Sequence, residues 1–359
     1  MARRCNANIN LSAIKKNYLY AKSLAPKAKA IAIVKANAYG HGAIEVASHL
    51  ESCADYFGVA CTEEAIDLRR SGLTKTPILL LEGLFEALEI DLVVSYNLTV
   101  AVCNPVQLDW VLSTSLKQRI NVFIKHDSGM GRLGFQDKEF KVALKLLEDS
   151  DNVRSITMMT HFSSAEEPEN DATSRQVKSF HEAVGKNNSP QSLANSAGII
   201  AVKSSHADYI RPGIMLYGSS PFKDKSYSDK LLSAMTLSSP LISIKSFKEG
   251  QTIGYGERFT CKKDMVIGVV AIGYGDGYPR SAKDGTPVFI NGDRSSLAGK
   301  VSMDMITIDL SNINDPQIGD QVELFGDNVS IDEVAEYCDT ISYEIFTQIT
   351  SRVYKTYDQ

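Results

Sequence analysis

Short apolar runs alternate with amphipathic segments from about residue 10 to residue 218. This alternation is typical of a parallel sheet whose strands are connected by helices. One connecting segment, 62–70, predicts a helix because Thr62 suits the N-cap, acidic residues follow it and arginines end it. Another helix is predicted from about Leu11. Eight apolar runs predict strands, at residues 30–34, 56–60, 77–81, 98–102, 120–125, 156–161, 192–195 and 209–211. Eight such units favour a (β/α)8 barrel, although a doubly wound open sheet fits the pattern as well.

The pattern changes after about Leu231. β-branched and apolar residues are interrupted there by Gly, Asp and Asn, as in the segment 265–273, which is typical of strands and tight turns. A chain of 359 residues is also longer than one hydrophobic core usually supports. The polar stretch 221–230 separates the two patterns. We therefore predict an α/β N-terminal domain at 1–230, a (β/α)8 barrel, and a mostly β C-terminal domain at 231–359.

The composition excludes several classes of protein. Hydrophobic residues make up 43% of the chain and charged residues 23%, as in ordinary globular proteins. The formal net charge of -5 argues against nucleic acid as a partner. No uncharged stretch approaches the length of about 20 residues that a membrane helix needs, and no signal peptide is recognisable at the N-terminus. The six cysteines lack the spacing of zinc ligands or redox pairs. We predict a cytoplasmic protein without a metal.

A lysine stands at the end of the first predicted strand. Lys35 follows the apolar residues 30–34 and precedes a turn that contains Gly40 and Gly42. In a barrel this places Lys35 at the C-terminal face, where active sites lie. An amine that is shielded from water there can lose its proton and form a Schiff base with an aldehyde cofactor. By its position alone, a lysine that only ends a strand in solvent is the commoner outcome.

The segment around Lys35, residues 30–42, resembles the pyridoxal 5′-phosphate (PLP) lysine motif of alanine racemases. Seven further segments resemble motifs of this family in the same order, at residues 125–134, 159–166, 195–198, 211–218, 253–256, 272–277 and 299–304. The resemblance implies a PLP-dependent isomerase that interconverts L-alanine and D-alanine and supplies D-alanine for peptidoglycan. It also implies a barrel followed by a β domain, assembled as a head-to-tail homodimer.

Racemisation requires two acid/base groups on opposite faces of the substrate, because a proton leaves one face and returns to the other. The resemblance implies that these groups are Lys35 and Tyr255, and that Tyr255 and Met303 serve the active site of the partner subunit. Free lysine and tyrosine have pKa values of about 10, so both need tuning to act as bases near neutral pH. The resemblance implies that His161, which is linked to Arg211, tunes the pKa of Tyr255. Without the resemblance, His161 fits a hydrogen-bonded core histidine.

The resemblance assigns further roles to cationic residues. Arg211 is implied to contact the pyridine nitrogen of PLP, to which arginine donates without losing its proton. This contact leaves the ring a weaker electron sink and limits side reactions such as transamination. Arg132 is the implied partner of the substrate carboxylate and the PLP phenolic oxygen. Lys125 corresponds to a lysine that is carbamylated in many members, and a plain buried or paired lysine is the alternative.

The PLP phosphate is expected to contact Tyr39, the Ser196 hydroxyl and the backbone N–H groups of Gly213 and Ile214. A glycine lets the backbone approach the anion, and a short helix beginning there would present free N–H groups. By itself, a Pro-Gly pair is simply a turn signal.

Two other expectations concern tyrosines. Many members have a phosphate-binding tyrosine directly before the final Arg-Val, but this chain has Ser351 there, so Tyr343 or Tyr354 is the candidate replacement. Tyr274 lies in the motif that lines the family's substrate entrance. Together with Tyr255 it would narrow access and favour a small side chain such as the methyl group of alanine.

Other functions remain open at this point. A racemase of the same fold could act on serine, lysine, arginine or several amino acids, and sequence separates these poorly. Barrel-type PLP decarboxylases share the two-domain plan, but their Gly-rich phosphate loop and Cys-containing C-terminal motif are not found here. A non-enzymatic PLP carrier would consist of the barrel alone, so the predicted β domain counts against it.

Overall fold

The computed structural model of the chain describes residues 5–227 and 229–358. They divide into two compact units. One unit contains residues 15–216 and 220–231, and the other contains residues up to 14, residues 217–219 and residues from 232 onward. Residues 1–4, where the sequence predicts no signal peptide, lie outside the described residues.

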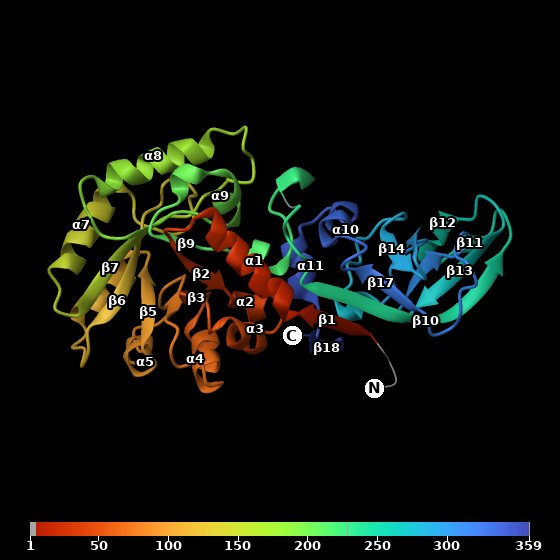
Figure 1. The fold of residues 1–359 in the computed structure, drawn as a ribbon, viewed down its shortest axis with the longest axis horizontal. Helices are drawn as coiled ribbons and strands as arrows, with labels where there is room; N and C mark the ends of the chain where they lie inside the picture. The colour runs from red at the N-terminus through yellow and green to blue at the C-terminus, as the bar shows by residue number, and fades with distance from the viewer. Residues whose placement is uncertain (1–4, 228, 359) are drawn as a thin grey trace. The chain divides into compact units, whose positions relative to one another are not determined.

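The first unit is built on a closed barrel of eight parallel strands (Figure 1). Consecutive strands are neighbours, and the ring closes where β9 pairs with β2, with Tyr209 opposite Lys29 and Ile210 opposite Ala30. This closure excludes the open sheet and confirms the predicted barrel. Each strand overlaps one predicted apolar run. The strands are β2 (Lys29–Ile33), β3 (Tyr56–Val59), β4 (Ile78–Leu80), β5 (Leu98–Val102), β6 (Ile120–Lys125), β7 (Val153–Met159), β8 (Gln191–Ser192) and β9 (Tyr209–Ile210).

The barrel interior is a packed apolar core. The rings of Tyr56, Phe123 and Tyr209 meet edge to face, with centroids 5.6 to 6.3 Å apart, an arrangement that aromatic rings favour. The buried cluster comprises Ile31, Ile33, Leu79, Ala101, Cys103, Phe123 and Met159. Because side chains fill the barrel, its chemistry is confined to the mouth.

Helices connect the strands and cover the outside of the barrel (Figure 1). The helix predicted from about Leu11 is present. Helix α4 has Thr62 as its first helical residue, and Cys61 occupies the N-cap without a side-chain cap bond. The expected Thr62 cap is therefore wrong by one residue. The helices are α1 (Leu11–Leu24), α2 (Lys35–Tyr39), α3 (Ala43–Leu50), α4 (Thr62–Arg70), α5 (Glu89–Ser95), α6 (Pro105–Ser113), α7 (Asp137–Glu148), α8 (Ala172–Val184) and α9 (Ser196–Ala201). Three short 3-10 helices follow, η1 (Lys203–Ser205), η2 (Ile214–Tyr217) and η3 (Lys225–Tyr227).

The second unit is mostly β, as predicted. Its main sheet runs in the order β15-β14-β17-β10-β1-β18, and β13 and β16 extend it from β10, while β11 and β12 form a separate pair. The strands are β1 (Asn6–Asn10), β10 (Met235–Phe247), β11 (Thr252–Ile253), β12 (Phe259–Thr260), β13 (Met265–Val270), β14 (Pro287–Ile290), β15 (Asp293–Ser296), β16 (Ile306–Asp309), β17 (Gln321–Phe325) and β18 (Tyr354–Asp358). The helices are η4 (Tyr255–Glu257), η5 (Tyr274–Asp276), α10 (Ile331–Tyr337) and α11 (Ser342–Gln348).

Strand β1 is a feature that the sequence pattern does not predict. It pairs in parallel with β18, with Asn6 opposite Tyr354, and antiparallel with β10, with Asn6 opposite Ser238. The first strand of the chain thus belongs to the sheet of the second unit. No helix in the described part of the chain combines the length and the apolar character needed to cross a bilayer.

Candidate active site

Four neighbouring strands of the barrel carry predicted site residues at their carboxyl ends. Strands β7, β8, β9 and β2 are consecutive around the ring. His161 follows β7, Ser196 begins the helix after β8, Arg211 follows β9, and Lys35 follows β2. Because the carboxyl ends of parallel strands meet at one face of a barrel, the fold brings these four residues to the same mouth.

Lys35 begins a turn of left-handed helix. Residues Ala36 to Tyr39 have φ angles between 51° and 54°, a conformation that costs an L-residue other than glycine about 1–2 kcal/mol. Inside the turn, the N–H of Ala38 donates to the carbonyl of Val34 at 2.8 Å. Such strain persists only where the surrounding structure holds the backbone in place.

A carboxylate that the sequence analysis did not single out lies beside Lys35. Glu82 Oε1 is 3.8 Å from Lys35 Nζ, and the two side chains are 37% and 35% exposed. The loop that carries Glu82 is fixed, since Gln107 Nε2 donates to the Glu82 carbonyl at 3.0 Å. The next residue, Gly83, has a φ of +81°, and a Cβ there would lie 2.5 Å from the carbonyl oxygen of Ala101. The only signal for Glu82 in the sequence was its position directly after the apolar run 77–81.

Tyr39, Ser196 and Gly213 form a cradle beside the turn. A Cβ at Gly213 would lie 3.0 Å from Tyr39 Oη, so glycine leaves the space that the phenol approaches. Ser196 Oγ accepts the N–H of Gly213 at 2.9 Å. Burial raises the pKa of Tyr39 to about 12, so the phenol stays protonated and can donate to an anion. Ile214 is the first residue of η2, where no earlier turn supplies an acceptor for its N–H.

Arg211 is buried and held by oxygen atoms at the strand ends. Nη1 donates to the carbonyl of Ser192 at 2.9 Å and to its Oγ at 2.7 Å. Nη2 donates to the carbonyls of Thr160 at 2.6 Å and Leu193 at 3.1 Å. Within residues 5–227 and 229–358, no acceptor is found for Nε. Burial lowers the pKa of Arg211 to about 10, so the guanidinium remains charged at neutral pH. A surface arginine paired with an acid would not make these contacts.

His161 lies in a strongly cationic environment. Its Nδ1 is 3.3 Å from Arg211 Nη2. Burial, followed by the charges of Arg211, Lys125, Arg132 and Lys35, holds the pKa of His161 well below its ordinary value. The ring is therefore neutral at neutral pH. Because Nδ1 faces an arginine donor, we assign the ring proton to Nε2.

Lys125 is 7% exposed at the end of β6. Burial lowers its pKa, and the charges of Arg211 and Arg132 act in the same direction. Lys125 therefore loses its proton more easily than an exposed lysine does. Both alternatives weighed for this residue, a carbamylated side chain and a plain buried amine, agree with its burial.

Arg132 is exposed on a loop that is tightly folded at its base. Asp127 Oδ1 accepts the N–H groups of Gly129, Met130 and Gly131 at 3.1, 2.9 and 3.0 Å. The N–H of Phe135 donates to the carbonyl of Lys125 at 2.8 Å and closes the loop. The loop therefore presents the guanidinium from a fixed backbone.

The predicted site residues of the second unit are exposed. Tyr255 is 70% exposed, Met303 52% and Tyr274 38%. The loops carrying Tyr274 and Met303 are joined, since the N–H of Tyr274 donates to the carbonyl of Ser302 at 3.0 Å and that of Gly275 to the carbonyl of Met303 at 2.9 Å. These apolar and aromatic side chains are thus presented outward on an ordered backbone.

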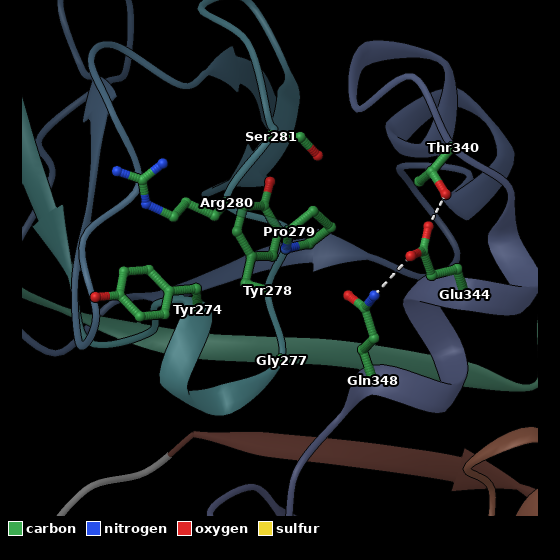
Figure 2. A pocket seen from close by; sticks show the side chains of 9 residues that line it. All are labelled: Tyr274, Gly277, Tyr278, Pro279, Arg280, Ser281, Thr340, Glu344 and Gln348. Atoms are coloured by element: carbon green, nitrogen blue, oxygen red, sulfur yellow. Dashed lines mark hydrogen bonds between the residues drawn. The ribbon is translucent and has the colours of Figure 1, made fainter.

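Tyr274 also borders an open pocket of about 390 Å³ in the second unit (Figure 2). The Arg280 guanidinium lies over the Tyr274 ring, 5.9 Å from its centroid (Figure 2), a favourable cation-π arrangement. On the opposite wall, Glu344 accepts hydrogen bonds from Thr340 and Gln348. The pocket therefore has a cationic side next to Tyr274 and a polar side on α11.

The three positions considered for the C-terminal phosphate contact lie in this unit as well. Ser351 and Tyr354 are exposed, the latter by 54%, and Tyr343 is half-buried on α11. Their role stays a prediction.

Family models match both parts of the chain. The model of the alanine racemase N-terminal domain matches residues 9–221, and that of the C-terminal domain matches residues 234–357. The alanine racemase of Chromohalobacter salexigens is 43% identical over 359 residues, which is 99% of this chain and 98% of that protein. The biosynthetic alanine racemase of Pseudomonas aeruginosa is 43% identical over 98% of each chain.

Solved structures agree with this assignment. The crystal structure of the biosynthetic alanine racemase from Pseudomonas aeruginosa superposes with a TM-score of 0.97 at 42% identity, covering 99% of this chain and 100% of that one. The alanine racemase from Bartonella henselae, whose crystal structure contains covalently bound pyridoxal phosphate, gives a TM-score of 0.90 at 27% identity and covers 99% of each chain. The fold and site thus define an amino-acid racemase of the barrel type.

This chain belongs to the alanine racemase family. The prediction of an enzyme that interconverts L-alanine and D-alanine is confirmed, and the racemases of other specificity and the barrel-type decarboxylase are not favoured.

Proposed function

We propose that the protein racemises alanine with PLP attached to Lys35, and with Lys35 and Tyr255 of the partner subunit as the two acid/base groups. The observation that carries this proposal is the set of Lys35, His161, Ser196 and Arg211 at the carboxyl ends of four adjacent barrel strands. In this proposal the domain boundary lies between residues 230 and 231, and the enzyme is cytoplasmic and supplies D-alanine for peptidoglycan.

The residues at the mouth of the barrel fit PLP chemically. Lys35 offers an amine to the aldehyde, and Arg211 has an Nε–H that no described residue engages. Tyr39 Oη, the Ser196 hydroxyl and the backbone at Gly213 and Ile214 form a cradle suited to a phosphate. When bound, PLP supplies an electron sink that acidifies the α-carbon of an attached amino acid.

The chain's own residues then move the protons. Lys35 Nζ takes or returns the α-proton on one face, and Tyr255 Oη of the partner subunit does so on the other. His161 carries a proton on Nε2 and can donate it in a hydrogen bond to that tyrosine oxygen, which stabilises the deprotonated form. Arg211 would keep its own proton while donating to the pyridine nitrogen of PLP, because its pKa of about 10 lies well above neutral pH.

Substrate orientation is assigned to the Arg132 guanidinium, which suits a planar carboxylate and would also hold the phenolic oxygen of PLP. Lys125 supports it in this proposal as an N6-carboxylysine. Its neutral amine combines with carbon dioxide to give a carbamate and release one proton, and the new anion pairs with Arg132. Met303 and Tyr274 of the partner subunit are assigned to the substrate side, where their bulk favours the methyl group of alanine.

A homodimer with shared sites follows from the roles of Tyr255 and Met303, whose exposure of 70% and 52% suits residues that a second subunit covers. Complementation tests this arrangement. Lys35→Ala and Tyr255→Phe chains are each expected to be inactive, but a mixed dimer contains one site with both native residues. Unfolding and refolding the two together should restore about a quarter of the native activity, since half of randomly paired dimers are mixed and each has one intact site. No recovery, although mixed dimers form, would place both bases in one chain.

The substrate is tested with a chiral assay across a panel of amino acids in deuterium oxide. We expect alanine to be racemised far faster than serine, lysine or arginine, with deuterium appearing at the α-carbon of alanine. Preference for lysine or arginine would overturn the substrate assignment. PLP binding without deuterium incorporation would instead indicate a carrier protein.

A further inference from the structure

The carboxylate of Glu64 joins the ends of two barrel strands. Its Oε1 accepts the N–H of Ala36 at 2.7 Å, and its Oε2 accepts the N–H of Ala60 at 2.8 Å. Ala36 directly follows Lys35, and Ala60 follows β3, the strand that pairs with β2. One side chain from the first turn of α4 therefore connects the backbone after Lys35 to the neighbouring strand.

The left-handed turn requires such a support. Its first N–H, at Ala36, has no acceptor inside the turn, as at the start of any helix. A carboxylate satisfies that donor with a charge-assisted hydrogen bond, which is stronger than a neutral one. Inside the turn, Asn37 Oδ1 accepts the N–H of Ala43 in α3 at 2.8 Å, and His41 Nδ1 contacts the carbonyls at the far end. Side chains thus hold the turn at both ends, and of these three side chains Glu64 alone comes from a distant part of the sequence.

We propose that Glu64 is a positioning residue for Lys35, holding the strained turn so that the amine is correctly placed for the cofactor. This inference rests on the proposed role of Lys35 as the PLP lysine. The turn also carries Tyr39 toward the cradle at Gly213. Displacing the turn would therefore move both Lys35, where PLP is attached in this proposal, and Tyr39, which is assigned to the phosphate.

The competing explanation is that Glu64 only caps α4 through Ala60. That role would contribute to stability and leave the turn at Lys35 unchanged. A matched control exists in Glu323, whose Oε1 accepts the N–H groups of Asn328 and Val329 at 2.8 and 3.1 Å. It also bridges two backbone donors but contacts no residue assigned to the site.

The test compares Glu64→Gln with Glu323→Gln in the full-length protein. An amide keeps one acceptor oxygen and turns an NH2 group toward the second N–H. We expect Glu64→Gln to raise the dissociation constant for PLP about tenfold, a change of about 1.4 kcal/mol, and to lower kcat more than it raises KM. In the PLP-free protein, hydrogen exchange should accelerate in the peptide covering residues 35–42. Glu323→Gln should change neither PLP affinity nor that exchange.

Glu64→Asp serves as the milder variant if Glu64→Gln does not fold. It keeps the charge, but its shorter side chain cannot span both donors, so the same local acceleration is expected. If exchange at 35–42 and PLP affinity stay native while Glu64→Gln lowers Tm as much as Glu323→Gln does, Glu64 is only a cap. A Lys35→Ala variant made in parallel separates the two proposals, because covalent PLP persisting in it would overturn the role of Lys35 itself.

Discussion

The two groups of residues assigned to the active site differ in how far the chain itself encloses them. At the mouth of the barrel, Arg211 is 3% exposed and Lys125 7%, so the field of neighbouring charges acts there with little screening. On the second unit, Tyr255 is 70% exposed and therefore lies in contact with solvent. Folding of the barrel alone thus encloses charged groups around Lys35, whereas Tyr255 would be enclosed only by a second surface.

We expect the largest loss of activity from a substitution at the mouth of the barrel. Lys35→Ala removes the amine that attaches PLP, so we expect no borohydride-fixed cofactor absorbance and no measurable racemisation. The matched control is Lys145→Ala, which removes an exposed lysine paired with Asp149 on α7. It should retain native absorbance and activity. Covalent cofactor in Lys35→Ala would mean that another lysine carries it.

Tyr255→Phe tests the exposed side. We expect PLP attachment to be native, because no residue assigned to the cofactor is altered, and racemisation to fall about 10²–10⁴-fold with the loss of one acid/base group. Lys35 should still exchange the α-proton of one alanine enantiomer with deuterium oxide without inversion. Proton NMR of each enantiomer measures this exchange. Equal exchange of both enantiomers would contradict the two-base assignment.

The sequence predicts the barrel well because its strands are buried on both faces and are read as continuous apolar runs. Lys35 became a candidate for the same reason, since it stands where such a run ends, although only the resemblance favoured it over a lysine in solvent. Strand β1 was missed because its sequence, Asn6–Asn10, contains three asparagines, which strands disfavour. Its pairing with β10 and β18 comes from distant parts of the chain.

The contacts that support Lys35 were not predictable in this way. Asn37 tolerates a positive φ, but Ala36, Ala38 and Tyr39 have no intrinsic preference for it, so the local sequence does not predict four consecutive left-handed residues. Glu64 was recognised only as an acidic residue near a helix start, and its bond to Ala36 exists because two strand ends come together in the barrel. Such approaches depend on tertiary structure, which a pattern along the chain does not contain.

The pH dependence of stability should report on His161 at the mouth of the barrel. The pKa of His161 is held well below its ordinary value, so below about pH 6.5 the unfolded chain binds a proton that the folded chain does not. His161 therefore lowers stability as pH falls from about 6.5 toward its folded pKa, by up to about 1.4 kcal/mol per pH unit. In His161→Gln the decline of Tm between pH 7 and pH 5 should be shallower, at fixed protein and PLP concentrations. Parallel curves for the two proteins would show that folding does not hold His161 in its neutral form.

The smallest effect, on PLP affinity, is expected for Tyr39→Phe. This substitution tests whether the Tyr39 phenol donates a hydrogen bond to the phosphate or only packs beside it. The substitution keeps the ring that packs on the barrel core and removes a phenol that burial holds protonated, with a pKa of about 12. A hydrogen bond to a charged group contributes about 1.5 kcal/mol or more, so the PLP dissociation constant should rise about tenfold while Tm of the PLP-free protein changes little. Tyr337→Phe, which alters an exposed tyrosine on α10, is the control for loss of a hydroxyl. If equilibrium titration gives Tyr39→Phe a native affinity for PLP, the phenol is no phosphate donor, and the backbone at Gly213 with the Ser196 hydroxyl must hold the anion without it.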